Sequence, residues 1–264
     1  MSGLSNNSSP PIIFLHGWGQ TRRAFDPLII ALNDRGVRSF AFDFPGHGDA
    51  RGEPGPFSFD RYASLVGEFA KSVGAKRFHL AGWSMGGTIA AIHCLEQREP
   101  RPLSLILVAS TPRFVAQENN LGVGQHPAAV KKMERMISSD HNAGLREFIG
   151  RFFESGEIIP ESMKAQIENL LIPENFPPNK DALLSTLKEL SALDLTISGR
   201  KWDGPVLNIQ GTADKITLKG GQKLWRGLFG DITEAPMESA GHAPHLTQTA
   251  GVAEIIAGFL SSLE

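Results

Sequence analysis

The stretch Phe78-His79-Leu80-Ala81-Gly82-Trp83-Ser84-Met85-Gly86-Gly87 decides the fold class of this 264-residue chain. Its first four residues have the composition of a buried β-strand, and apolar residues recur at helical spacing from Met85 to Gln97. Gly-x-Ser-x-Gly between a strand and a helix is the signature of a nucleophile elbow. Such a tight turn lifts the serine hydroxyl clear of the backbone, and small residues at positions 82 and 86 prevent a collision. The alternative is a glycine-rich turn that only packs a helix on a strand.

Short apolar runs alternate with longer helix-like segments on both sides of this stretch. Strands that are apolar on both faces are typical of a parallel sheet covered by helices. Repeated β–α alternation therefore predicts an α/β fold with a mostly parallel sheet flanked by helices. The predicted strands are Ile12–Leu15, Val37–Phe42, Arg77–Ala81, Leu103–Ala109, Val206–Gln210 and Ile232–Ala235. The predicted helices are Arg22–Arg35, Asp60–Val73, Met85–Gln97, Lys219–Leu228 and Gln248–Leu263.

Residues 113–202 break the alternation, because they contain helix-like pieces and no convincing strand. Ligands of open α/β sheets bind at the carboxyl ends of the strands, so we expect this block to cover that edge as a lid. The predicted domains are then a core, residues 1–112 and 203–264, and a helical lid, residues 113–202. The helices expected in the lid are Ala128–Ser138, Gly144–Glu154, Pro160–Leu171 and Asp181–Thr196.

A nucleophilic serine needs a base and an acid that orients the base. In hydrolases of this architecture the order along the chain is Ser, then Asp or Glu, then His. Asp214 follows the strand Val206–Gln210, and His242 lies between the last predicted strand and the last helix. We therefore predict Ser84, Asp214 and His242 as the catalytic residues.

Several other residues are candidates for the same roles or for a metal site. The segment Ser110-Thr111-Pro112 offers no carboxylate after its strand, which favours Asp214 as the acid. His245 is interpreted as a helix cap or a pocket-wall residue, and His47 as part of a turn. His242 and His245 have the spacing of two zinc ligands, but no third ligand or His-Glu-x-x-His pattern accompanies them, so no metal is predicted. The side chains of His79, His93 and Cys94 are interpreted as packing residues.

The loop His16-Gly17-Trp18-Gly19 follows the first predicted strand, where hydrolases of this kind place one donor of the oxyanion hole. The second donor is the backbone N–H of the residue after the nucleophile. We therefore predict an oxyanion hole formed by the N–H groups of Trp18 and Met85. The alternative is that His16-Gly17 is only a tight turn.

Composition excludes several classes of function. The 26 basic and 28 acidic residues give a net charge of −2, which offers no general attraction for nucleic acid. A single cysteine, Cys94, forms no internal disulfide, and no apolar run reaches the roughly 18 residues of a membrane span. The polar start lacks the basic region of a secretory signal. We expect a cytoplasmic protein.

Together these motifs resemble the α/β-hydrolase superfamily from about Ile12 onward, and in detail the pimeloyl-[acyl-carrier protein] methyl ester esterases of biotin synthesis. The resemblance implies a Ser-His-Asp hydrolase without a cofactor, whose lid lies between the sixth and seventh family strands. It also implies that Trp83 forms a pocket wall, and we expect Trp18, Trp83 and Phe152 to bind substrate. The family has one or two strands before the residues that match Ile12, so we expect a short sheet at that edge.

The same resemblance implies a substrate carried on an acyl carrier protein. The segment Ala128–Arg151 has a small positive excess, which suits an acidic partner at the lid, although a solvated helix face explains it as well. Its charged residues are Lys131, Lys132, Glu134, Arg135, Asp140, Arg146, Glu147 and Arg151.

The predicted function is a serine carboxylesterase, with pimeloyl-[acyl-carrier protein] methyl ester as the expected substrate. A perhydrolase, a C–C bond hydrolase or a menaquinone-pathway lyase would use the same three residues. A third possibility is a receptor that binds its ligand on this scaffold without cleaving it, since a fold does not determine a function. The sequence does not specify the oligomeric state.

Overall fold

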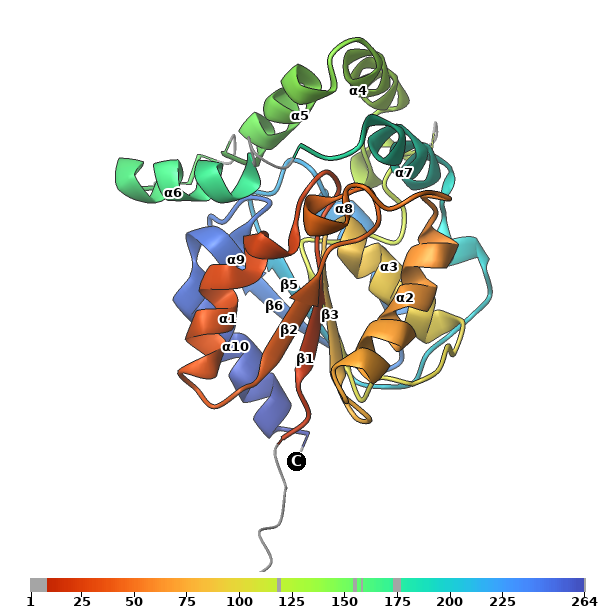
Figure 1. The fold of residues 1–264 in the computed structure, drawn as a ribbon. Helices are drawn as coiled ribbons and strands as arrows, with labels where there is room; N and C mark the ends of the chain where they lie inside the picture. The colour runs from red at the N-terminus through yellow and green to blue at the C-terminus, as the bar shows by residue number, and fades with distance from the viewer. Residues whose placement is uncertain (1–8, 118–119, 154–155, 158, 173–176, 264) are drawn as a thin grey trace, which may run out of the picture.

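The computed structural model describes residues 9–117, 120–153, 156–157, 159–172 and 177–263, which form a six-stranded sheet with helices on both faces (Figure 1). The strand order is β2-β1-β3-β4-β5-β6, and all neighbouring strands pair in parallel. The predicted α/β-hydrolase fold class agrees with this sheet. The strands are β1 (Ile12–Leu15), β2 (Ser39–Phe42), β3 (His79–Trp83), β4 (Leu105–Val108), β5 (Val206–Gly211) and β6 (Ile232–Met237).

The burial of each strand follows its place in the sheet. The inner strands are buried along their whole length, whereas β2 and β6 at the two edges are partly exposed. Pro236 lies in β6, where no further strand needs its missing N–H. The described residues before β1, 9–11, contain no strand, and the short edge expected there stays a prediction.

All six predicted strands are present, but the predicted bounds of β3 were wrong. The prediction ended this strand at Ala81 because glycine usually marks a turn. In the structure β3 continues to Trp83, since Gly82 aligns with Leu15 of β1 and Trp83 aligns with Val108 of β4. Ser84 therefore follows the last paired residue of the strand directly.

Helices cover both faces of the sheet. Helices α1 (Asp26–Asn33) and α10 (Thr249–Ser261) pack together on one face, and α2 (Phe59–Ser72) and α3 (Met85–Leu95) on the other (Figure 1). Every residue of α3 is buried, so the packing role predicted for His93 and Cys94 is confirmed. Shorter elements of the core are η1 (Arg22–Phe25), η2 (Gly48–Ala50), α8 (Lys219–Gln222), η6 (Lys223–Gly227) and α9 (Pro244–Thr247).

The segment between β4 and β5, here called the helical insertion (residues 113–202), contains no strand of the sheet among its described residues. Its helices lie across the carboxyl ends of the strands (Figure 1). The four predicted helices are present, but the one predicted to reach Thr196 ends at Ala192, and Glu154, the predicted end of another, lies outside the described residues. The division into a core domain and a lid stays a prediction. The elements are η3 (Leu121–Val123), α4 (Pro127–Ser139), α5 (His141–Gly150), η4 (Arg151–Phe153), α6 (Glu161–Leu171), α7 (Lys180–Ala192) and η5 (Leu195–Ile197).

The two ends of the insertion are held together where they leave the core. Arg113 forms an ion pair of 3.1 Å with Asp194, and both side chains are about nine-tenths buried. The N–H of Leu195 donates to the carbonyl of Pro112 at 3.0 Å. The insertion lies between the fourth and fifth strands of this sheet; the expected sixth and seventh places counted two opening strands that the described residues lack.

Within the described residues, no helix has both the length and the apolar composition that crossing a membrane requires. The expected cytoplasmic location stays a prediction.

Candidate active site

Ser84 occupies a strained turn between β3 and α3. Its backbone has φ 54° and ψ −118°, in a region that residues with side chains rarely adopt. A Cβ atom at Gly82 would overlap the backbone of Gly86, and one at Gly86 would overlap the carbonyl of Leu15. A side-chain hydrogen bond also stabilises the turn, since the hydroxyl of Ser110 donates to the Ser84 carbonyl at 2.8 Å. Glycine is therefore required on both sides of the serine, as the sequence pattern suggested.

The structure brings the three predicted catalytic side chains into one hydrogen-bonded chain. His242 Nε2 lies 3.0 Å from Ser84 Oγ, and His242 Nδ1 lies 2.9 Å from Asp214 Oδ2. A carboxylate only accepts hydrogen bonds, so the Nδ1 proton donates to Asp214 and Nε2 can accept from the serine hydroxyl. Ser84 is partly exposed, whereas His242 and Asp214 are buried.

Asp214 is surrounded by donors. Its Oδ1 accepts from the N–H groups of Ile216 at 2.7 Å and Thr217 at 3.0 Å. Its Oδ2 accepts from the Thr217 hydroxyl at 2.6 Å and from Gln210 Nε2 at 3.0 Å, besides His242. Burial by itself raises the pKa of this carboxyl, but His242 and the hydrogen bonds outweigh burial, so the pKa lies below its ordinary value. Asp214 is therefore a carboxylate at neutral pH.

Two aromatic residues fix the position of His242. The indole N–H of Trp83 donates to the His242 carbonyl at 2.8 Å. The ring of Phe152 lies 4.9 Å from the imidazole and 5.6 Å from the Trp83 ring, measured between centroids. Phe152 comes from the helical insertion and Trp83 from the core, so both parts of the chain contact the imidazole.

A hydrogen bond from His16 to the Gly17 carbonyl orients the peptide group that carries the Trp18 N–H. His16 Nε2 accepts from the Phe44 N–H at 3.0 Å, so its Nδ1 carries the proton and donates to the Gly17 carbonyl at 2.9 Å. Burial lowers the pKa of His16 to about 4, which keeps the ring neutral and able to make both bonds. The Trp18 N–H points away from the Gly17 carbonyl, because the two groups belong to one trans peptide.

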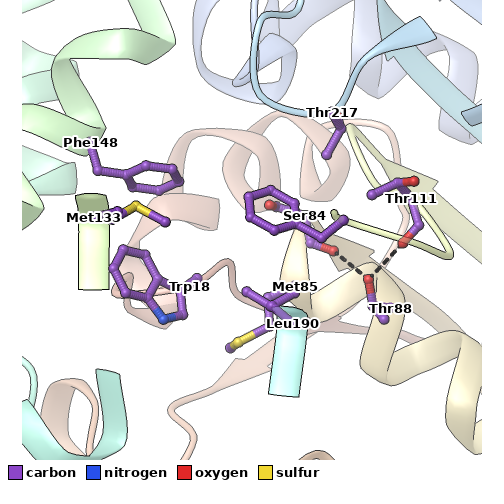
Figure 2. A pocket seen from close by; sticks show the side chains of 10 residues that line it. Trp18, Ser84, Met85, Thr88, Thr111, Met133, Phe148, Leu190 and Thr217 are labelled. Atoms are coloured by element: carbon purple, nitrogen blue, oxygen red, sulfur yellow. Dashed lines mark hydrogen bonds between the residues drawn. The ribbon is translucent and has the colours of Figure 1, made fainter. Parts of the chain in front are cut away.

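Trp18, Ser84 and Met85 line one pocket. Neither the Trp18 nor the Met85 N–H donates to a backbone carbonyl within the described residues, so both can serve a ligand. Figure 2 shows Trp18, Met133 and Phe148 on one side of Ser84, and Thr88 and Thr111 on the other. Phe114, Leu190 and Thr217 complete the lining, and among the described residues that line the pocket none has a charged side chain.

Of the three residues predicted to bind substrate, only Trp18 lines this pocket. Trp83 and Phe152 lie against His242 instead, and their contact with a substrate stays a prediction. The three threonines and the apolar residues of the insertion were not predicted from the sequence. Thr88 lies one helical turn after Ser84, and Thr217 three residues after Asp214, so their spacing could have indicated them. Met133, Phe148 and Leu190 carry no such signal, because apolar helix residues equally form the core.

The interpretation of His245 as a cap or pocket-wall residue was wrong. Its side chain is fully buried between the rings of Trp83 and Phe25, at centroid distances of 4.6 and 5.3 Å. Neither ring nitrogen has a hydrogen-bond partner among the described residues. The part of the chain that the structure describes has no cluster of three or more His, Cys, Asp or Glu residues able to hold a metal ion.

The sequence pattern of the alpha/beta hydrolase family matches residues 12–255. The chain belongs to this family. It is 28% identical over 255 residues to a pimeloyl-[acyl-carrier protein] methyl ester esterase of Aeromonas hydrophila, with 95% of each chain covered.

Two solved structures share the fold. An esterase from Exiguobacterium antarcticum superposes with a TM-score of 0.85 at 22% identity, covering 96% of this chain and 92% of its own. A bromoperoxidase from Bacillus anthracis gives the same TM-score of 0.85 and the same coverage, at 21% identity. At this level of identity the likeness describes the fold alone.

Proposed function

We propose that the protein is a serine carboxylesterase and that its substrate is pimeloyl-[acyl-carrier protein] methyl ester or a chemically close ester. One observation carries the proposal: the hydrogen-bonded chain from Asp214 through His242 to Ser84 ends at a pocket that also holds Trp18 and Met85. A serine, a base and an orienting acid in this arrangement form the machinery of acyl transfer.

In the proposed reaction Ser84 Oγ attacks the ester carbonyl while His242 Nε2 accepts its proton. Asp214 holds the imidazole in the required tautomer and stabilises its charged form. The N–H groups of Trp18 and Met85 stabilise the oxyanion, and one such donor is typically worth about 2.7–4 kcal/mol in the transition state. His242 then protonates the departing alcohol, and a water activated by the same ring hydrolyses the acyl-enzyme.

The uncharged lining favours a neutral ester group at the reacting end. Burying an ion without a partner costs several kcal/mol, and none of the ten lining residues carries a charge that could offset this. A methyl ester fits such a pocket, whereas the carboxylate that hydrolysis produces does not. The pocket would therefore hold the substrate better than the product. The Aeromonas hydrophila relative, by its name an esterase of such a methyl ester, supports the same choice.

A carrier protein would dock on the helical insertion. The contacts of its basic side chains suggest which of them would bind an acidic partner. Lys132 pairs with Glu147 at 3.3 Å, and Arg151 donates to Gln125 at 3.2 Å. Lys131 and Arg135 are exposed on α4. These two residues are the proposed contacts for an acidic partner. Replacing both with Glu should raise the KM for a carrier-bound ester and leave the KM for a small ester unchanged.

The decisive experiment incubates the purified protein with pimeloyl methyl ester on acyl carrier protein and follows the carrier by mass spectrometry. Loss of one methyl group, absent with Ser84→Ala, supports the proposal. If a fluorophosphonate probe labels Ser84 but the carrier-bound ester is not demethylated, the protein is a serine hydrolase that acts on another substrate. No labelling of the folded wild-type protein would favour the receptor hypothesis and refute the esterase.

A further inference from the structure

Gln125 is a buried polar residue of the helical insertion that contacts the loop carrying Asp214. Its side-chain nitrogen donates to the carbonyls of Lys215 and Ile216, at 2.8 Å each. Its side-chain oxygen accepts from Arg151 at 3.2 Å. These partners fix the orientation of the amide, because a flipped amide would turn its oxygen toward two carbonyl oxygens.

The two carbonyls belong to the same peptide groups that hold the acid. The Lys215 carbonyl shares a peptide plane with the N–H of Ile216, and the Ile216 carbonyl shares one with the N–H of Thr217. These N–H groups are the donors to Asp214 Oδ1. In a trans peptide the N–H and C=O point in opposite directions. Each peptide group is therefore held by Gln125 at its carbonyl end and holds Asp214 at its N–H end.

We infer that Gln125 is a positioning residue for the proposed hydrolysis. Through these two peptide groups it fixes the orientation of Asp214 toward His242. Hydrogen bonds in such a series also polarise one another, so donation to the carbonyls strengthens the N–H donors at the carboxylate. Gln125 is itself anchored to the segment after β4, because its N–H donates to the Phe114 carbonyl at 2.8 Å. The insertion thus contributes to the geometry of the acid as well as to the pocket wall.

The inference rests on the proposed function, and Gln125→Glu tests it. Glutamate keeps the size of the side chain and an oxygen for Arg151, but it turns an oxygen toward the two carbonyls. With 4-nitrophenyl acetate we expect kcat to fall about 10- to 100-fold, because small displacements of catalytic groups have effects of this size. KM should stay within about twofold, since no substrate contact is removed. The low-field proton resonance of the His242–Asp214 hydrogen bond should shift or broaden.

Gln117→Leu is the matched control. Gln117 also lies in the insertion, but its exposed amide donates to Asp194, at 3.4 Å, and not to the loop of Asp214. This variant should keep the wild-type kcat and the wild-type proton resonance. Gln125→Leu removes the donors without adding a charge and should resemble Gln125→Glu if it folds.

A folded Gln125→Glu protein with kcat within about twofold of wild type would overturn the inference, as would a loss confined to KM. If the wild-type protein neither hydrolyses esters nor reacts with a fluorophosphonate, the proposed function fails. The proton resonance then decides the role of Gln125 separately: an unchanged resonance in Gln125→Glu overturns the inference, and a changed one supports it.

Discussion

Replacing Asp214 with asparagine should abolish most activity through the tautomer of His242. The Oδ1 position faces two backbone N–H groups, from Ile216 and Thr217, and only an oxygen fits there. The new NH₂ group must then occupy the Oδ2 position. Of its neighbours at that position, His242 Nδ1 and the Thr217 hydroxyl can accept from the new group, whereas the Gln210 amide, which also faces the Gly211 and Thr217 carbonyls, loses its bond to residue 214.

The substitution changes which nitrogen of His242 carries the proton. An NH₂ group facing Nδ1 donates to it, so the ring proton moves to Nε2. Nε2 then faces Ser84 Oγ, 3.0 Å away, as a donor and no longer accepts the serine proton. In a serine protease the same change lowers kcat about 10⁴-fold, which corresponds to roughly 5.5 kcal/mol of transition-state stabilisation. We expect a loss of this order here.

The assay is hydrolysis of 4-nitrophenyl acetate at neutral pH, with thermal unfolding measured on the same samples. The protein should still fold, with a somewhat lower melting temperature, because the two N–H groups of the new amide replace the bonds to His242 and Thr217 but not the bond to Gln210. Ser84→Ala provides the background rate of the scaffold. If folded Asp214→Asn kept more than about a tenth of the wild-type kcat, the tautomer mechanism derived from these contacts would be refuted.

Three further outcomes are expected. Gly86→Ala should unfold the elbow or lower its stability by more than about 2 kcal/mol in urea titrations, since its Cβ would overlap the Leu15 carbonyl. Burial lowers the pKa to about 4 for His16 and to about 3 for His47 and His245, so the native state keeps these rings neutral where the unfolded chain binds protons. Stability should therefore fall as pH drops below about 6.5, by about 1.4 kcal/mol per pH unit for each ring, and His245→Phe should reduce that slope by one such increment in urea titrations between about pH 6 and pH 4.5. Phe148→Ala should enlarge the pocket and lower KM for longer acyl chains relative to acetate in a 4-nitrophenyl ester series; an unchanged preference would place the acyl chain elsewhere.

The sequence alone was sufficient for the features that depend on local backbone geometry. The two glycines around Ser84 are needed because a Cβ at either position overlaps neighbouring backbone, and a short pattern therefore identifies the turn. The strands were found because strands buried on both faces have an apolar composition that few other elements share. Chain order then located Asp214 and His242, since the carboxyl ends of parallel strands meet at one edge.

Side-chain orientation could not be predicted in the same way. The place of Trp83 in the pocket wall stays a prediction, and no pattern indicated that its indole would donate to the His242 carbonyl, 159 positions away in the chain. His245 was interpreted as a helix cap or a pocket-wall residue, but it packs between two aromatic rings that come from different parts of the core. Both outcomes depend on which tertiary neighbour fills the available space. A single sequence gives no information about that choice.

The helical insertion contacts both loops that carry the residues partnering Ser84. Gln125 holds the loop of Asp214, and the carboxylate of Glu157 accepts from the N–H of Gly241, next to His242, at 3.1 Å. Glu157 also accepts from Gln248 at 3.1 Å. An insertion that moved to admit a large substrate would loosen these contacts, and its return would restore them. Exchanging the insertion for one of another specificity would therefore need equivalents of Gln125 and Glu157. An exchange that kept only the pocket-lining residues should alter substrate choice and lower kcat together.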